Sequence, residues 1–188
     1  MMNRYPFWFF TSVVLAVLAH VYYVLFVPSR SFNHAIDLAL ADKPVNSFVL
    51  LDAATHMKLM PFTTASHLVG ICKFDTTAGN IRVGAKMPEG FWNFAVYSLR
   101  GKQVYAINDK QADTNAFSVL LSKSEGVIGQ ALGLGEDVLD VSTDDLGWRI
   151  ALPDAQGLAI LWFAVPDPLL RAKAIEDMQQ SRCAKSDG

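Results

Sequence analysis

The sequence predicts a mainly β, α+β fold. We expect an antiparallel β-sandwich or barrel-like domain with short N-terminal and C-terminal helices, preceded by one transmembrane helix. Three observations predict it. No charged residue lies between Arg4 and Arg30, short β-rich runs separated by turn residues follow from residue 68, and a Pro-Asp-Pro sequence at 166–168 opens a last amphipathic segment. Regularly spaced strands with turn signals are typical of antiparallel sandwiches and barrels.

The uncharged run is long enough for one membrane crossing. A helix rises about 1.5 Å per residue, and the hydrocarbon core is about 30 Å thick. Aromatic residues that suit the headgroup layer lie near both ends: Tyr5, Trp8, Tyr22 and Tyr23. A cleaved signal peptide is the alternative, but its apolar core would be only about 7–15 residues long, and Val27-Pro28-Ser29 is a poor cleavage site. We therefore expect residues 1–30 to be a retained anchor and residues 31–188 to form one domain.

One face of the predicted anchor carries residues that suit contact with a second helix. They are Ser12, Ala16, Ala19, His20 and Tyr23. Small residues let helices approach closely, and an imidazole in lipid needs a hydrogen-bond partner. Chance composition would also explain the small residues, but it explains His20 less well. Lys and Arg are nearly balanced across the anchor, so charge does not set its orientation.

The first half of the domain begins with a short helix and continues with strands. Residues 33–41 are predicted helical, with Ser31 or Asn33 as the cap and Pro44 as the stop. Strands are predicted at Phe48–Leu51, Leu68–Phe74, Ile81–Ala85, Phe91–Leu99, Val104–Ile107 and Phe117–Leu121. The run 91–99 is the clearest because aromatic and β-branched residues dominate it, and Arg100-Gly101 ends it.

The second half holds three more strands and the last helix. Glycines make 125–134 a loop or a short helix, and strands are predicted at Val138–Val141, Trp148–Leu152 and Leu158–Val165. The last is almost entirely apolar, which places it in the middle of a sheet. Asp167 and Pro168 are predicted to start a helix that ends near 182–183, with Leu170, Ala174 and Met178 on its buried face.

Composition and motifs narrow the range of functions that the chain could have. The net charge is −2 and there is no polybasic tract, so we expect no nucleic-acid partner. The sequence contains no G-x-S-x-G, H-E-x-x-H, Walker or G-x-G-x-x-G motif of the usual context. We therefore expect no cofactor and no catalytic residue. His56 and His67 lie near Asp52 in a loop-like stretch, where a metal site competes with ordinary solvated histidines.

Two residue pairs are candidates for ligand binding. Trp92 and Tyr97, together with Phe91 and Phe94, would line a cavity of the sheet or simply pack in the core. Arg100 with Asn108-Asp109 is the best polar cluster, but a hairpin between the two strands would put Arg100 at its turn and Asp109 at the far end. Turn and edge-strand roles are the alternative for this second pair.

Two cysteines, Cys72 and Cys183, leave two possibilities open. One is a buried thiol and a separate thiol in the tail. The other is a single disulfide that fastens the C-terminal segment to a strand, which requires a domain outside the cytoplasm. Their spacing to each other and to the histidines does not indicate a zinc site.

The order of these segments resembles a bacterial family of domains of unknown function. The resemblance lies in Val69–Asp75, Gly79–Val83, Pro88–Tyr97, Arg100-Gly101, Tyr105–Asp109, Gly157–Val165, Pro166-Asp167-Pro168 and Arg182-Cys183. In that family the domain occurs at the N-terminus of larger exported β-rich proteins of Gram-negative bacteria. It also occurs in short single-pass proteins, often encoded beside a second small membrane protein. The resemblance implies a periplasmic β-rich domain and no established activity.

Two functional hypotheses follow. In the first, the chain is a non-enzymatic subunit or scaffold of a cell-envelope complex, whose partners are the lipid bilayer and another small membrane protein. In the second, it is an envelope enzyme or a small-molecule or lipid-binding protein with its site in the sheet cavity. We expect it in the inner membrane with its domain in the periplasm, because the resemblance and the disulfide hypothesis agree on this side.

Overall fold

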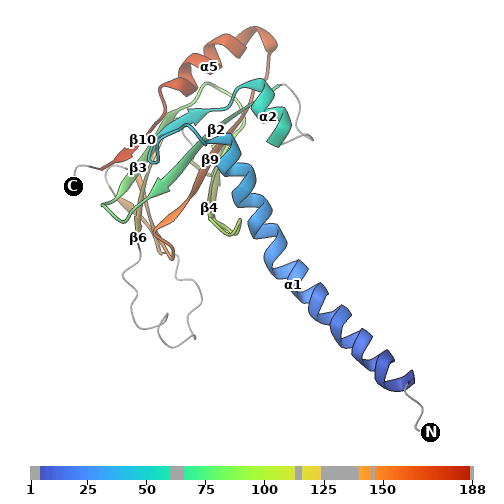
Figure 1. Cartoon of the computed structure of the whole chain (residues 1–188). Helices are drawn as coiled ribbons and strands as arrows, with labels where there is room; N and C mark the ends of the chain where they lie inside the picture. The colour runs from blue at the N-terminus through green and yellow to red at the C-terminus, as the bar shows by residue number, and fades with distance from the viewer. Residues whose placement is uncertain (1–4, 60–65, 113–115, 124–139, 145–146, 187–188) are drawn as a thin grey trace.

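A long helix joined to two five-stranded sheets makes up the described part of the chain (Figure 1). The structure is a computed structural model that describes residues 5–59, 66–112, 116–123, 140–144 and 147–186. The long helix, α1, is Tyr5–Ala39. The shorter helices are α2 (Ala53–Leu59), α3 (Asp109–Ala112), the 3-10 turn η1 (Pro168–Leu170) and α5 (Arg171–Gln179).

Sheet A has the strand order β1-β2-β9-β4-β5, and each neighbouring pair is antiparallel. Its strands are β1 (Phe48–Leu50), β2 (His67–Asp75), β4 (Trp92–Ser98), β5 (Gln103–Asn108) and β9 (Gln156–Ala164). The strand β9 lies at the centre, with Ile160 opposite Ile71 of β2 and Ala95 of β4. Both of its faces are covered, which is why its sequence is a continuous apolar run.

Sheet B has the order β10-β3-β6-β8-β7. Its strands are β3 (Ile81–Lys86), β6 (Ala116–Lys123), β7 (Asp140–Asp144), β8 (Gly147–Leu152) and β10 (Arg182–Lys185). All pairs are antiparallel except β6 and β8, which run parallel with Leu121 opposite Ile150. Parallel neighbours require a longer connection than a hairpin, and the connection here includes β7.

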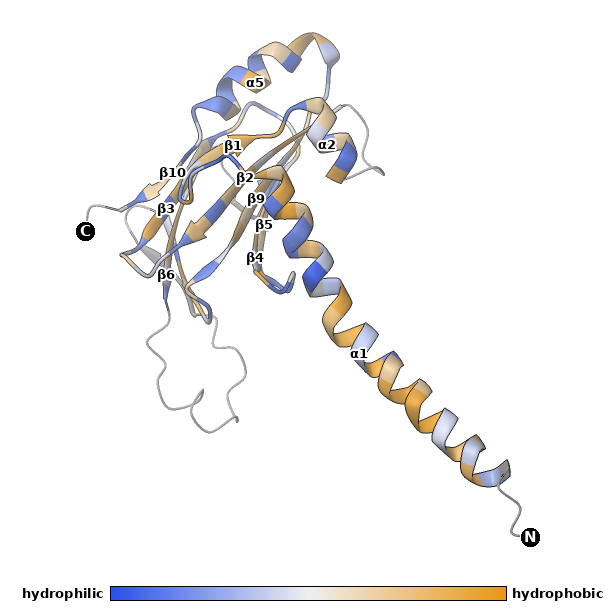
Figure 2. Ribbon diagram, viewed as in Figure 1, coloured by the Kyte–Doolittle hydropathy of each residue, from blue (hydrophilic) through white to orange (hydrophobic). Residues whose placement is uncertain are grey.

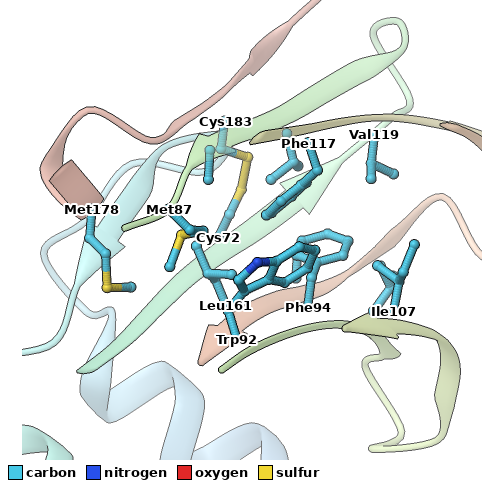
Figure 3. Packing of buried hydrophobic residues seen from close by; sticks show 14 of the residues in the cluster. Cys72, Met87, Trp92, Phe94, Ile107, Phe117, Val119, Leu161, Met178 and Cys183 are labelled. Carbon is cyan, nitrogen blue, oxygen red and sulfur yellow. A yellow bond between two sulfur atoms is a disulfide. The ribbon is translucent and has the colours of Figure 1, made fainter. Parts of the chain in front are cut away.

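The sheets pack face to face around aromatic side chains at alternate strand positions (Figure 3). Trp92 and Phe94 of β4 both contact Phe117 of β6, with ring centroids 5.1 and 5.0 Å apart. Other fully buried side chains come from both sheets: Phe74, Ile81, Leu121, Ile150, Leu152, Leu161 and Phe163. This alternation of inward and outward side chains is the packing of a β-sandwich.

The other face of sheet A is covered by the C-terminal end of α1. Phe32, Ile36 and Ala39 lie on one face of this segment, and Leu40 follows it directly. They belong to a second apolar cluster with residues of β2 and β9: Val69, Ile71, Leu158, Ile160 and Trp162. The helix and the sandwich are therefore joined by a buried contact as well as by the chain.

The predicted fold class and most strands are confirmed, but two predicted helix boundaries and the burial of one residue are wrong. The predicted separate helix at 33–41 is the end of α1, which continues through Pro28. Proline removes one backbone donor, yet the following turns are stabilised by burial on sheet A. The last helix stops at Gln179, and residues 182–185 form β10 instead of its end. Within it, Ala174 and Met178 are buried as predicted, but Leu170 is 50% exposed.

The helix α2 was not predicted and replaces part of the loop expected around His56. Asp52 precedes it and accepts hydrogen bonds from the backbone N–H of Thr55 (2.9 Å) and from its hydroxyl (2.7 Å). These two bonds lower the pKa of the Asp52 carboxyl and satisfy a donor of the first turn. The predicted strand at 138–141 is observed from Asp140, while the expected loop at 125–134 lies outside the described residues.

Candidate functional site

The N-terminal part of α1 projects from the domain and is mainly apolar, with a few paler, more polar positions (Figure 2). From Phe7 to Phe26 its large apolar side chains are 44–67% exposed. Within the described residues, α1 is the one helix that is long and apolar enough to cross a membrane. A helix that is hydrophobic all round requires an apolar surrounding, which a bilayer supplies.

The predicted helix-contact residues lie on this projecting part. Ala16, Ala19, His20 and Tyr23 are exposed. The Ser12 hydroxyl donates to the Trp8 carbonyl at 2.8 Å, so it is satisfied within its own helix. The imidazole of His20 has no hydrogen-bond partner among the described residues, which leaves it available to a second helix. The prediction that this face contacts a partner therefore remains a prediction.

A disulfide joins Cys72 of β2 to Cys183 of β10 and so connects sheet A to sheet B. The two Cα atoms are 6.4 Å apart, and both cysteines are buried. Figure 3 shows the sulfur–sulfur bond beside the aromatic core. The two bridged cysteines are 111 positions apart in the sequence. Disulfides persist in oxidising compartments, so the bridge indicates that the domain lies outside the cytoplasm.

The four predicted ligand-binding residues are not brought together. Trp92 is fully buried in the core, and its indole N–H has no partner among the described residues. Tyr97 lies on the opposite face of β4, beside Phe32 of α1, and donates to Gln103 Oε1 at 3.2 Å. The alternation of a strand separates them, because positions five apart face opposite ways.

The polar pair is separated in the same hairpin. Arg100 is exposed in the turn between β4 and β5. Asn108 ends β5 and exchanges hydrogen bonds with Gln111, which donates its N–H to Asn108 Oδ1 at 3.0 Å. The Asn108 N–H in turn donates to Gln111 Oε1 at 3.2 Å. This reciprocal pattern is a capping box that starts α3, so these contacts give Asn108 a structural role.

His56 and His67 lie close to each other although they are 11 residues apart. His56 is buried on α2, and His67 of β2 stacks on Trp162 with ring centroids 4.5 Å apart. Burial lowers the pKa of His56, and the charges of His67 and Arg171 lower it further. Within the described ranges, no group of three or more His, Cys, Asp or Glu is placed to hold a metal ion.

Two adjoining grooves cross the surface on the α5 and sheet B side. The first has a volume of about 560 Å³ and lies between α5 and the β3–β4 connection, with Met87, Phe163, Leu170 and Ala174 among its lining residues. The second has a volume of about 480 Å³ and lies over β10, β3 and β6. Lys86 and Gln180 line both, so the grooves are continuous.

The second groove is basic, and sequence reasoning did not find it. It is lined by Arg82, Lys86, Arg182 and Lys185, with no carboxylate among the described lining residues. Arg82 and Arg182 are a hundred positions apart in sequence and meet only because β10 pairs with β3. The available signal was the spacing of Arg82, Gly84 and Lys86, which puts them on one face of a strand.

No family model matches the chain, and no curated protein matches it. Among solved structures, the chain is similar to the VPA0106 protein from Vibrio parahaemolyticus, with 12% identity and a TM-score of 0.57. The alignment covers 86% of this chain but 36% of that one, so the chain spans about a third of its length. A putative uncharacterized protein from Burkholderia cenocepacia aligns over 85% of this chain and 41% of its own, with 11% identity and a TM-score of 0.47. The Vibrio parahaemolyticus structure shows that the sandwich fold recurs within a longer protein.

Proposed function

We propose that the chain is a single-pass inner-membrane protein that presents its β-rich domain to protein partners in the periplasm, as a subunit or scaffold of a cell-envelope complex. The main observation behind this proposal is that α1 has two parts with different surroundings. One continuous helix is uncovered and apolar from Phe7 to Phe26 and then packs one face against sheet A from Phe32 to Ala39.

The buried end of α1 would hold the domain in a fixed orientation above the membrane. Ile36 and Leu40 are 8% and 7% exposed, and each buried aliphatic side chain contributes about 1.5–3 kcal/mol. Lys73 adds an ion pair to Asp37 at 2.8 Å, but this pair is exposed and stabilises the contact little. A flexible linker would not restrict orientation in this way, whereas docked helical turns do.

Two further features support the proposal. The disulfide favours the oxidising side of an inner membrane, which is the periplasm in Gram-negative bacteria. The resemblance to short single-pass members of the bacterial family favours a second small membrane protein as the partner. Ala16 and His20 would supply the contact in the bilayer, because small and hydrogen-bonding residues promote helix association.

Membrane extraction and copurification test this proposal. The full chain should remain in the membrane pellet after an alkaline carbonate wash. The double variant Ala16→Ile/His20→Leu should also remain there, since both changes raise hydrophobicity, but it should recover less of the partner. The matched control Val14→Ile/Val21→Ile adds bulk to the other side of the helix and should leave partner recovery unchanged.

Three results would contradict the proposal or its assigned contact face. Release of the wild-type chain into the carbonate supernatant would exclude a spanning anchor. Equal partner recovery by all three forms would exclude the Ala16–His20 face, and loss of recovery in the control alone would assign the contact to the other side.

A further inference from the structure

We propose that the basic groove on sheet B, with the apolar groove beside it, binds an extended acidic segment of a partner protein. This inference deepens the proposed function and depends on it, because it names the chemistry of the partner of the same domain. It assigns that partner contact to the domain surface, in addition to any contact made by the anchor in the bilayer.

The strand pattern builds the basic groove. On β3, Ile81, Val83 and Ala85 are buried in the core, so Arg82, Gly84 and Lys86 face outward. The register of β10 sets Arg182 opposite Gly84 and Ala184 opposite Arg82. Arg82 and Arg182 therefore each have a small residue across the strand pair. The small residues form a hollow floor, and the charged side chains form its sides.

The charges of this groove are not neutralised by the described part of the chain. Lys86, Arg182 and Lys185 form no ion pair with another described residue. Arg82 donates from Nη1 to the Ser118 hydroxyl at 3.0 Å, which orients its guanidinium and leaves other N–H groups to donate. Arg82, Lys86 and Arg182 on the outward face attract anions, and an oriented arginine binds a carboxylate with little further ordering.

The adjoining groove favours a peptide over a small anion. Its lining is largely apolar, with Met87, Phe163 and Leu170 around a volume of about 560 Å³. Its Lys173 is already paired with Asp177 at 3.3 Å. One apolar side chain of an extended segment would fill this hollow while its acidic side chains reach Arg82 and Arg182. Alternate side chains of an extended segment lie about 6.5–7 Å apart on one face, so acidic residues two apart would point into the same groove.

The position of the groove favours a partner other than the bilayer that holds α1. In Figure 1, α5 and β10 lie at the end of the domain remote from the N-terminal end of α1. The headgroups around the anchor would lie on the opposite side. An acidic protein segment is therefore the occupant that charge, shape and position together favour.

Peptide selection on the full chain tests the proposal. The protein is reconstituted in phosphatidylcholine nanodiscs, and random nonapeptides displayed on phage are selected against it. We expect enriched peptides to carry two or more acidic residues at alternating positions and one apolar residue to one side. The affinity of a labelled selected peptide, measured by fluorescence anisotropy, should fall at least about tenfold in Arg82→Glu/Arg182→Glu and should weaken as salt is added.

Two further variants distinguish the effect of groove charge on peptide affinity from an effect on folding. Lys43→Glu/Lys58→Glu makes the same change of charge at exposed positions outside the groove and should keep wild-type affinity. Gly84→Val fills the floor without changing charge. A Cβ at Gly84 would meet only the Phe117 carbonyl oxygen, at 3.5 Å, so the fold accommodates it. This variant should melt like the wild type and still bind the peptide more weakly.

Several outcomes would overturn the proposal. They are enrichment of no peptide, enrichment of peptides without acidic residues, and equal affinity for the wild type and the Arg82→Glu/Arg182→Glu variant. Binding of inorganic pyrophosphate without any selected peptide would assign the groove to small anions and would also overturn it. None of these results bears on carbonate extraction, so failure here is distinguishable from failure of the membrane-anchored role.

Discussion

Removal of the Cys72–Cys183 bridge should destabilise the domain strongly. The bridge closes a loop of 111 residues. The chain-entropy model assigns about 5 kcal/mol to a loop of this length at 25 °C. For a domain of about 150 residues, each kcal/mol corresponds to roughly 2–4 °C, so the melting temperature should fall by about 10–20 °C.

Thermal unfolding followed by circular dichroism measures this loss in detergent-solubilised protein. Cys72→Ala, Cys183→Ala and the double variant should melt within a few degrees of one another, because each removes the same bridge. The wild type unfolded with reductant present is the control, since it lacks the bridge but keeps both side chains. It should melt close to the variants, and the oxidised wild type should melt well above all of them.

The same change should loosen one strand in particular. The strand β10 has four residues and, among the described strands, pairs with β3 alone, so the bridge ties it to sheet A. Hydrogen–deuterium exchange should rise at residues 182–185 in every form without the bridge, while β9 should keep its protection near neutral pH until global unfolding. Equal melting of all forms, or quantitative alkylation of both cysteines in unreduced unfolded protein, would refute this reasoning.

Three further predictions test the docked helix, the cap of α3 and the buried histidine. Ile36→Ala should lower the free energy of unfolding of the domain by about 2–3 kcal/mol in urea titrations, whereas exposed Leu38→Ala should change it by less than about 0.5 kcal/mol. Asn108→Ala should cost about 1 kcal/mol through loss of the α3 cap, and Asn108→Asp, which keeps the acceptor oxygen, should restore most of it. The lowered pKa of His56 means that the folded domain binds this proton more weakly than the unfolded chain, so stability should fall as pH drops below about 6.5 and level off below the folded pKa. His56→Gln should reduce this slope in urea midpoints measured from pH 7.5 to 5, and an unchanged slope would show that other groups cause it.

Local sequence patterns predicted the sandwich because its strands carry strong signals of their own. The central position of β9 followed from a run with apolar residues on both faces. The clearest predicted strand, 91–99, is confirmed as β4. Its aromatic and β-branched residues favour a strand, and they lie on two covered faces of the sheet. Asp167 was predicted as a cap, and it accepts a hydrogen bond from the Leu169 N–H at 2.9 Å.

The features that sequence reasoning missed depend on contacts between distant segments. Arg182-Cys183-Ala184-Lys185 has no β-branched residue, and it forms β10 because β3 and the disulfide hold it. The helix α1 passes Pro28 because its next turns are buried on sheet A. The basic groove combines two strands that are a hundred residues apart, so neither strand alone reveals it.

The side of the membrane on which the domain lies is the central claim, and paired C-terminal fusions test it most directly. Alkaline phosphatase is active only after export, whereas green fluorescent protein exported in the unfolded state through the general secretion route does not fluoresce. Both fusions to the full chain are expressed in a Gram-negative host and normalised to protein level. We expect an active phosphatase fusion and a dark fluorescent fusion. An inactive phosphatase fusion with a bright fluorescent one would place the domain in the cytoplasm and exclude a periplasmic domain.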